Sequence, residues 1–103
     1  MAKFTKAIAQ KMLGDVAQDK WFWCYDGREL KNLPRLGTAL NEMSDETFRY
    51  HSNETKNDFS NWVKDVIGDD KLSRDLEKSK TQVQAAKAVA DRVAWLKSRV
   101  ETS

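Results

Sequence analysis

Residues 81–100 read TQVQAAKAVADRVAWLKSRV, and this stretch decides the fold class. Its larger apolar positions recur every three or four residues, at Ala86, Val89, Val93, Leu96 and Val100. That spacing places side chains on one face of an α-helix. Thr81 and Gln84 have the spacing of a capping box, which marks the start of a helix. The pattern predicts a long helix that packs against the rest of the chain or forms a helix pair.

Shorter helical patterns fill most of the preceding chain. An apolar stripe covers residues 4–17, and further helices are predicted from Asn32 to Met43, from Ser44 to His51, from Asp58 to a stop at Gly68, and from Asp69 through Leu76. The sequence therefore predicts a mostly α fold of five or six helices, in an orthogonal or bundle-like arrangement. Residues 1–103 form one helical domain in this interpretation.

An aromatic segment, Trp21-Phe22-Trp23-Cys24-Tyr25, interrupts the helical patterns and runs into Asp26-Gly27. Aromatic residues favour strands, and Asp-Gly suits a two-residue hairpin turn with positive φ at both positions. A short aromatic β-hairpin is expected near 21–31; an irregular aromatic loop is the alternative. In a strand, Trp21, Trp23 and Tyr25 share one face. That face either binds a partner or is sandwiched, like the opposite one, between the first and last helices.

The composition narrows the function classes. The chain has 103 residues, which suffices for one core without disulfides or metals, and its net charge is +2, too small to require a nucleic-acid or membrane partner. A single cysteine and the lack of a long apolar run favour a cytoplasmic protein with no membrane contact. The first 20 and last 25 residues are nevertheless basic, so a nucleic-acid binder that uses the terminal helices stays open.

Few residues are suited to catalysis. His51 is the only histidine and Cys24 the only thiol, and no catalytic residue, metal site or cofactor is predicted from them. Cys24 lies among aromatic residues, where a thiol is buried and inert. His51 is expected at a helix end, in a structural or capping role. An enzyme or small-molecule binder would have to centre on His51 and Asp58.

The segment Phe48-Arg49-Tyr50-His51, followed by Asn57-Asp58-Phe59-Ser60-Asn61-Trp62, has distinctive spacing. With the later Gly68-Asp69-Asp70-Lys71-Leu72, it resembles a family of small uncharacterised archaeal and bacterial domains that have an aromatic-x-x-His and an Asn-Asp-Phe-x-x-Trp pattern. The resemblance covers roughly residues 22–97 and implies no established activity. In physical terms, a hydrogen bond from His51 to Asn57 or Asp58 would close the polar loop between them, over Phe48, Phe59 and Trp62.

The first function hypothesis is a non-catalytic protein-interaction or regulatory module, with another protein or a second copy of the chain as partner. Its candidate contact residues are Trp21, Trp23, Tyr25 and Trp95, because exposed Trp and Tyr carry much of the binding energy in protein interfaces. Trp95 lies beside the apolar stripe of the last helix and either widens it or projects to a partner. The alternatives are the nucleic-acid binder and the site centred on His51 and Asp58.

Overall fold

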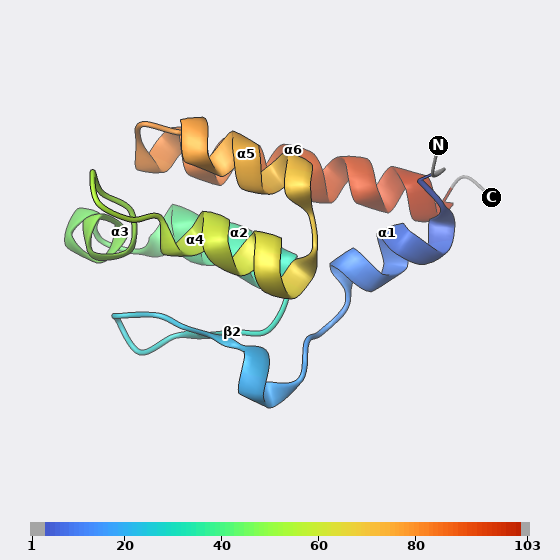
Figure 1. The fold of residues 1–103 in the computed structure, drawn as a ribbon, viewed down its shortest axis with the longest axis horizontal. Helices are drawn as coiled ribbons and strands as arrows, with labels where there is room; N and C mark the ends of the chain where they lie inside the picture. Colours follow the sequence, from blue (N-terminus) through green and yellow to red (C-terminus); the bar gives the residue numbers. More distant parts are fainter. Residues whose placement is uncertain (1–3, 102–103) are drawn as a thin grey trace.

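Six α-helices and one short hairpin make up residues 4–101, the part of the chain described by the computed structural model (Figure 1). The α-helices are α1 (Lys6–Leu13), α2 (Leu33–Glu42), α3 (Asp45–His51), α4 (Asp58–Trp62), α5 (Asp70–Lys78) and α6 (Gln82–Glu101). The strands β1 (Phe22–Trp23) and β2 (Glu29–Leu30) pair antiparallel. A 3-10 turn, η1 (Gln18–Lys20), precedes β1, and a π-helix, η2 (Val63–Ile67), continues α4. The predicted mostly helical fold with an aromatic hairpin is confirmed.

The helices form two layers with the hairpin outside them (Figure 1). α5 and α6 form one layer, and α2, α3 and α4 form the other. α6 packs along α2 and also contacts α1, whereas the hairpin lies against α2 on the side away from α6. The core between the layers includes the fully buried side chains of Leu36, Leu40, Leu72, Val89 and Leu96. The long C-terminal helix therefore organises the core, as its periodicity predicts.

α2 and α6 approach closely because Gly37 has no side chain. A Cβ atom at Gly37 would lie 3.3 Å from Val89 Cγ1. The same two helices are joined at one end by Gln82, whose Nε2 donates to the carbonyl oxygens of Leu40 and Met43, each at 2.8 Å. Gln82 thus satisfies carbonyl groups that the end of α2 leaves without helical partners.

Most of the predicted caps are present. The side chains of Asn32, Ser44, Asp69 and Thr81 each accept a backbone N–H in the first turn of the helix that follows. Gly68 ends η2 with φ +82°, a left-handed conformation that suits glycine. These helix boundaries follow from local chemistry, which is why the sequence predicts them.

Two predicted boundaries are wrong. The helix expected over 4–17 ends at Leu13, with Gly14 as its C-cap, because the chain then turns toward the hairpin and the Val16 N–H donates to the Lys31 carbonyl at 2.9 Å. The N-cap of α4 is Asn57, whose Oδ1 accepts the Ser60 N–H at 3.0 Å, and not Asp58. Asp58 is the first residue of the helix and its carboxylate is available for a different partner.

Asp69 has a second role that the sequence does not predict. Its carboxylate caps α5 and also receives two hydrogen bonds from Arg92 of α6, at 2.7 Å and 3.0 Å. Both side chains are buried, with 1% of Asp69 and 10% of Arg92 exposed. A bidentate arginine–carboxylate pair fixes the relative direction of the two side chains as well as their distance. It therefore sets the orientation of α5 relative to α6.

No helix within residues 4–101 has the length and apolar character needed to cross a membrane.

Candidate functional site

The aromatic segment forms the hairpin, with a longer turn than predicted. Phe22 pairs with Leu30 and Trp23 with Glu29, and the Cys24 N–H donates to the Arg28 carbonyl at 2.9 Å. Of the described residues between the strands, only Gly27 has positive φ, at +95°, so the predicted two-residue turn with positive φ at both positions is wrong. The Gly27 N–H donates to the Cys24 carbonyl instead. The loop therefore holds three residues, with glycine in the left-handed position.

Alternation along β1 and the two residues after it separates buried from exposed side chains. Phe22 and Cys24 are buried, whereas Trp23 is 57% and Tyr25 is 55% exposed. Trp21 is half-buried, and its ring centroid lies 5.9 Å from that of Trp23. The strand interpretation is confirmed, and the alternative in which helices cover both faces is wrong. The hairpin buries only one face because it lies outside the two helical layers.

Tyr50 joins the exposed residues, and the sequence interpretation missed it. Its ring, 50% exposed, stacks on Tyr25 with the centroids 4.3 Å apart. The Lys56 ammonium lies 4.5 Å from the Tyr50 ring centroid. Helical periodicity could have identified Tyr50, because Thr47, Phe48 and His51 share the buried face of α3 and place residue 50 on the opposite one. Trp21, Trp23, Tyr25 and Tyr50 are together called the aromatic face below.

Hydrogen bonds hold the hairpin in place at several points. Trp21 Nε1 donates to the Val16 carbonyl at 3.1 Å, and Trp62 Nε1 donates to the Lys20 carbonyl at 2.8 Å. At the turn, Arg28 binds the carboxylate of Asp26 and also that of Glu42 at the end of α2, at 2.7 Å. Because these contacts come from three different segments, the aromatic face has a fixed position on the helices.

His51 makes the central connection between the hairpin and the helices. Its Nε2 accepts the backbone N–H of Tyr25 at 2.9 Å, and its Nδ1 lies 3.0 Å from Asp58 Oδ2. Since an amide N–H can only donate, Nε2 must carry the lone pair, and the ring proton lies on Nδ1 and points to Asp58. The imidazole is 5% exposed and both of its nitrogens are bonded internally. No ring nitrogen is left for a substrate.

Asp58 completes this connection at the surface. Its carboxylate is 32% exposed and also receives the Lys56 ammonium at 3.0 Å. Partial burial opposes ionisation, but the hydrogen bonds from His51 and Lys56 outweigh it and lower the pKa of Asp58. Asp58 therefore orients the imidazole as an anion. The predicted closure of the loop by His51 is confirmed for Asp58 and is wrong for Asn57.

The other motif residues have structural partners. Phe48 stacks on Phe59, with centroids 5.8 Å apart, and Phe59 contacts His51 at 5.3 Å. Trp62 meets Phe22 edge-on at 5.9 Å. Asn57 caps α4 and donates from Nδ2 to the Leu76 carbonyl at the end of α5, at 3.1 Å. The motif thus forms the surface against which the hairpin packs.

Cys24 is buried beneath the hairpin. Burial raises the pKa of its thiol, although backbone N–H groups nearby oppose the shift in part. A thiol of raised pKa is a weak nucleophile at neutral pH.

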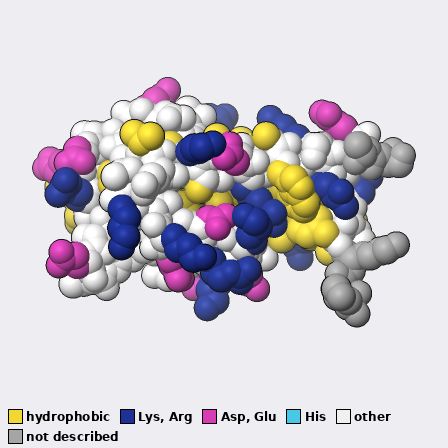
Figure 2. Space-filling view, turned by 90° about the horizontal axis from the view of Figure 1, so that it is seen from above, with side chains coloured by type: hydrophobic (Ala, Val, Ile, Leu, Met, Phe, Trp, Pro, Cys, Tyr) yellow, Lys and Arg dark blue, Asp and Glu magenta, His cyan; other side chains and the backbone are white. Residues whose placement is uncertain are grey.

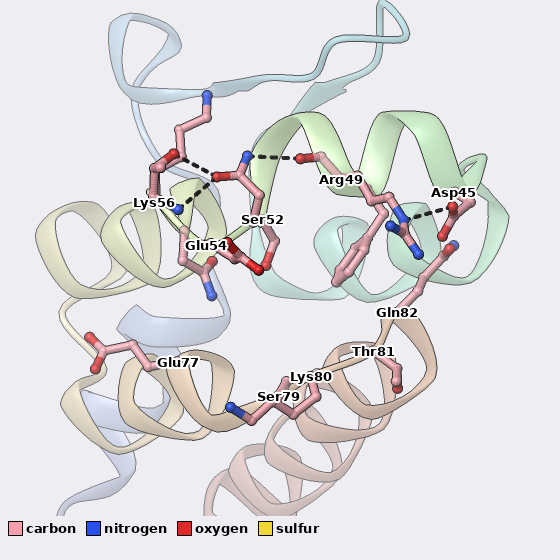
Figure 3. A pocket seen from close by; sticks show the side chains of 14 residues that line it. Asp45, Arg49, Ser52, Glu54, Lys56, Glu77, Ser79, Lys80, Thr81 and Gln82 are labelled. Atoms are coloured by element: carbon pink, nitrogen blue, oxygen red, sulfur yellow. Dashed lines mark hydrogen bonds and ion pairs between the residues drawn. The ribbon is translucent and has the colours of Figure 1, made fainter.

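A polar groove of about 1000 Å³ opens between the loop after α3 and the connection from α5 to α6 (Figure 3). Side chains of both charges line it, including Arg49, Lys56, Lys80, Glu54 and Glu77. His51 and Asp58 are not among the lining residues. His51 and Asp58 therefore lie outside this groove, whereas a small ligand needs its binding residues to line a concave site.

Trp95 lies apart from the aromatic face, at the contact between α1 and α6. It is 40% exposed, meets Phe4 edge-on at 4.9 Å, and has the guanidinium groups of Arg92 and Arg99 at 4.5 Å and 5.4 Å from its ring centroid. Figure 2 shows hydrophobic side chains gathered over the C-terminal half of α6, with basic groups beside them. Trp95 thus widens the packed stripe and also reaches the surface.

The basic terminal helix carries less free charge than its sequence suggests. Lys87 pairs with Asp91 at 2.8 Å, and Arg92 is buried against Asp69. Phosphate binding requires cations that are free to exchange counterions. Both pairings reduce the support for a nucleic-acid surface on α6.

Among residues 4–101, no group of three or more His, Cys, Asp or Glu side chains is placed to hold a metal ion. Comparison of the chain with protein-family models, with curated proteins and with solved structures finds no match. The family resemblance of the His51–Trp62 segment therefore stays a prediction.

Proposed function

We propose that this domain is a non-catalytic protein-interaction module whose contact surface is the aromatic face. One observation carries the proposal: Trp23, Tyr25 and Tyr50 are each at least half exposed, Tyr25 stacks on Tyr50, and Trp23 lies two residues before Tyr25 in the hairpin. Exposing large aromatic side chains to water is unfavourable, and clustered exposure marks surfaces that a partner covers.

The construction of the aromatic face supports this role. Trp and Tyr offer large contact areas with only two side-chain torsions each, so little conformational entropy is lost when they are covered. The contacts of His51, Trp62 and Arg28 already fix the backbone beneath them. A surface that is ordered before binding loses less free energy on association than a flexible one.

The surroundings of His51 and Cys24 argue for binding over catalysis. A general base must have a nitrogen within hydrogen-bond reach of the proton it removes. Tyr25 and Asp58 occupy both nitrogens of His51, and the thiol of Cys24 is buried with a raised pKa. The two groups best suited to catalysis by type are thus used in the fold.

Site-specific photo-crosslinking in cells tests the proposal. A photoreactive phenylalanine analogue is placed at Trp23 or at Tyr25, and at Val83 as the control, because Val83 is an exposed apolar residue on α6. We expect the same discrete protein adduct from positions 23 and 25 and not from position 83, and we expect excess unlabelled protein to suppress it. Equal labelling at all three positions, or none at 23 and 25, would overturn the proposal.

A further inference from the structure

Glu29 adds a carboxylate to the aromatic face. It is exposed, and it pairs with Trp23 across the hairpin. The adjacent pair, Cys24 and Arg28, is hydrogen-bonded. Because the two kinds of pair alternate along an antiparallel ladder, Trp23 and Glu29 form a non-hydrogen-bonded pair, with Cβ atoms about 5 Å apart on the same face. The carboxylate therefore lies beside the exposed indole ring.

Two other exposed rings of this domain contact a cation that is also paired with a carboxylate. The Lys56 ammonium lies 4.5 Å from the Tyr50 ring centroid and 3.0 Å from the Asp58 carboxylate. The Arg92 guanidinium likewise lies 4.5 Å from the Trp95 ring centroid, while it is paired with the carboxylate that caps α5. In both places the ring and the carboxylate attract the cation together.

Trp23 and Glu29 present the same combination of groups. Within residues 4–101, no Lys or Arg side chain lies over the Trp23 ring, and the Glu29 carboxylate makes no ion pair. Lys31, two residues after Glu29 and on the same face by alternation, is paired with Asp15 at 3.7 Å. The ring and the carboxylate are therefore both available to a cation of another molecule.

The charges around the hairpin also favour a cationic partner. Residues 19–31 and the groups that form ion pairs with them carry five carboxylates and three cations, a net charge of −2: Asp15, Asp19, Asp26, Glu29 and Glu42 against Lys20, Arg28 and Lys31. The chain as a whole has a net charge of +2. The hairpin is therefore an acidic region on a basic protein, and it attracts positive charge.

We infer that the aromatic face binds an arginine side chain of its partner, with the guanidinium stacked on the Trp23 indole and paired with the Glu29 carboxylate. A guanidinium is planar, stacks on aromatic rings and donates two parallel hydrogen bonds to a carboxylate. Trp is the aromatic residue that attracts cations most strongly. The inference rests on the proposed function and names the chemistry of the partner.

Other occupants complement Trp23 and Glu29 less well. A lysine ammonium is a strongly hydrated point charge that neither stacks on the ring nor binds the carboxylate with two parallel bonds. A quaternary ammonium is bound by a cage of several rings, but Tyr25 and Tyr50 stack on each other with their centroids 4.3 Å apart, which leaves no room for a cation between them. Single-stranded nucleic acid stacks on aromatic rings, but the Glu29 carboxylate repels its phosphates.

Amide and indole NMR spectra of the whole chain, titrated with a glycine–serine peptide that contains several arginines, test the inference. The controls are the same peptide with lysines, and with citrullines, which keep the planar group and lose its charge. We expect saturable shifts of the Trp23 indole and the Glu29 amide with the arginine peptide, weaker binding of the lysine peptide, and no binding of the citrulline peptide at the same concentrations.

Three variants locate the binding site. Trp23→Ala should raise the dissociation constant of the arginine peptide about three- to thirtyfold, and Glu29→Gln about two- to fivefold. Glu101→Gln is the matched control, because Glu101 is also exposed and makes no ion pair with another described residue. It lies on α6, in the layer on the other side of α2 from the hairpin (Figure 1), so the dissociation constant should stay unchanged at about 0.1 M salt.

Three results would overturn the inference: binding of the lysine or citrulline peptide as tight as that of the arginine peptide, equal losses in Glu29→Gln and Glu101→Gln, or unchanged spectra at millimolar arginine peptide. Because Trp23 and Glu29 are exposed, their variants should unfold at the wild-type temperature, which checks the fold. If the arginine peptide fails while the crosslinks at positions 23 and 25 persist, the partner chemistry is wrong and the interaction module stands.

Discussion

Replacing His51 by alanine should destabilise the domain far more than loss of an ordinary helix-end residue. The change removes the bond from the Tyr25 N–H, worth about 1 kcal/mol, and the bond to the Asp58 carboxylate, worth about 1.5 kcal/mol. It also leaves a cavity beside Phe22 and Phe59, which costs about 1 kcal/mol more. Water that reaches the partly exposed Asp58 offsets a fraction of this sum. We therefore expect a loss of about 3 kcal/mol.

Urea unfolding followed by circular dichroism measures that loss, and amide hydrogen exchange locates it. The Tyr25 amide should exchange faster in His51→Ala even where α6 stays protected. Two variants test the two hydrogen bonds separately. The longer side chain of His51→Gln can still accept the Tyr25 N–H, and the shorter one of His51→Asn can still donate to Asp58. Each should recover about 1 kcal/mol.

Arg49→Ala is the matched control, because Arg49 lies on the same helix and its side chain is 76% exposed and, among residues 4–101, paired only with Asp45. It should change the free energy of unfolding by less than about 0.5 kcal/mol. If His51→Ala costs no more than Arg49→Ala, or if the Tyr25 amide exchanges at the wild-type rate, the imidazole is not the connection described above.

Three further predictions concern the rest of the scaffold. Because folding lowers the pKa of Asp58, its ionised carboxylate stabilises the fold at pH values above the unfolded pKa, about 3.9, and this stabilisation is lost as the pH falls through the folded pKa. Asp58→Asn should therefore flatten the acid side of a curve of unfolding free energy against pH. An unchanged acid side would contradict this. Asp69→Ala leaves Arg92 buried without a partner and should cost about 3–5 kcal/mol by urea unfolding, more than Asp69→Asn, which keeps the cap. A wild-type free energy of unfolding in Asp69→Asn would assign the whole effect to the cap. Gly68→Ala places an alanine in the left-handed conformation and should lower the stability measured in thermal melts by about 1–2 kcal/mol. Gly14→Ala, at φ −76°, should be neutral or stabilising. A larger loss of stability in Gly14→Ala than in Gly68→Ala would contradict the backbone conformation of these two residues.

Features that depend only on neighbouring residues were predictable from the sequence. The long helix follows from the spacing of its apolar residues, and Asn32, Ser44 and Asp69 begin helices because their side chains bind amides three residues on. Alternation within residues 21–25 likewise separated Trp23 from Phe22. Each of these depends on geometry over a few residues, so no knowledge of the tertiary fold is needed.

Features that join distant segments were not predictable in this way. The Arg92–Asp69 pair connects residues 23 apart, and the bond from Tyr25 to His51 connects residues 26 apart. Both depend on how the layers stack, which the local pattern leaves open. For this reason the basic character of the last 25 residues includes Arg92, although its charge is paired with Asp69 inside the fold. Tyr50 was missed because its exposure matters only once the hairpin brings Tyr25 beside it.

The aromatic face and the His51–Trp62 segment, two separate places in the sequence, are one unit in the fold. His51, Phe59 and Trp62 of the segment are buried and Asp58 is bonded to His51, whereas Trp23, Tyr25 and Tyr50 are exposed. Changes in the two places should therefore have different consequences. Loss of His51 should lower stability and partner binding together, because the backbone under Tyr25 loses its support. Loss of the Trp23 ring should lower binding alone, since that ring contributes little to the core.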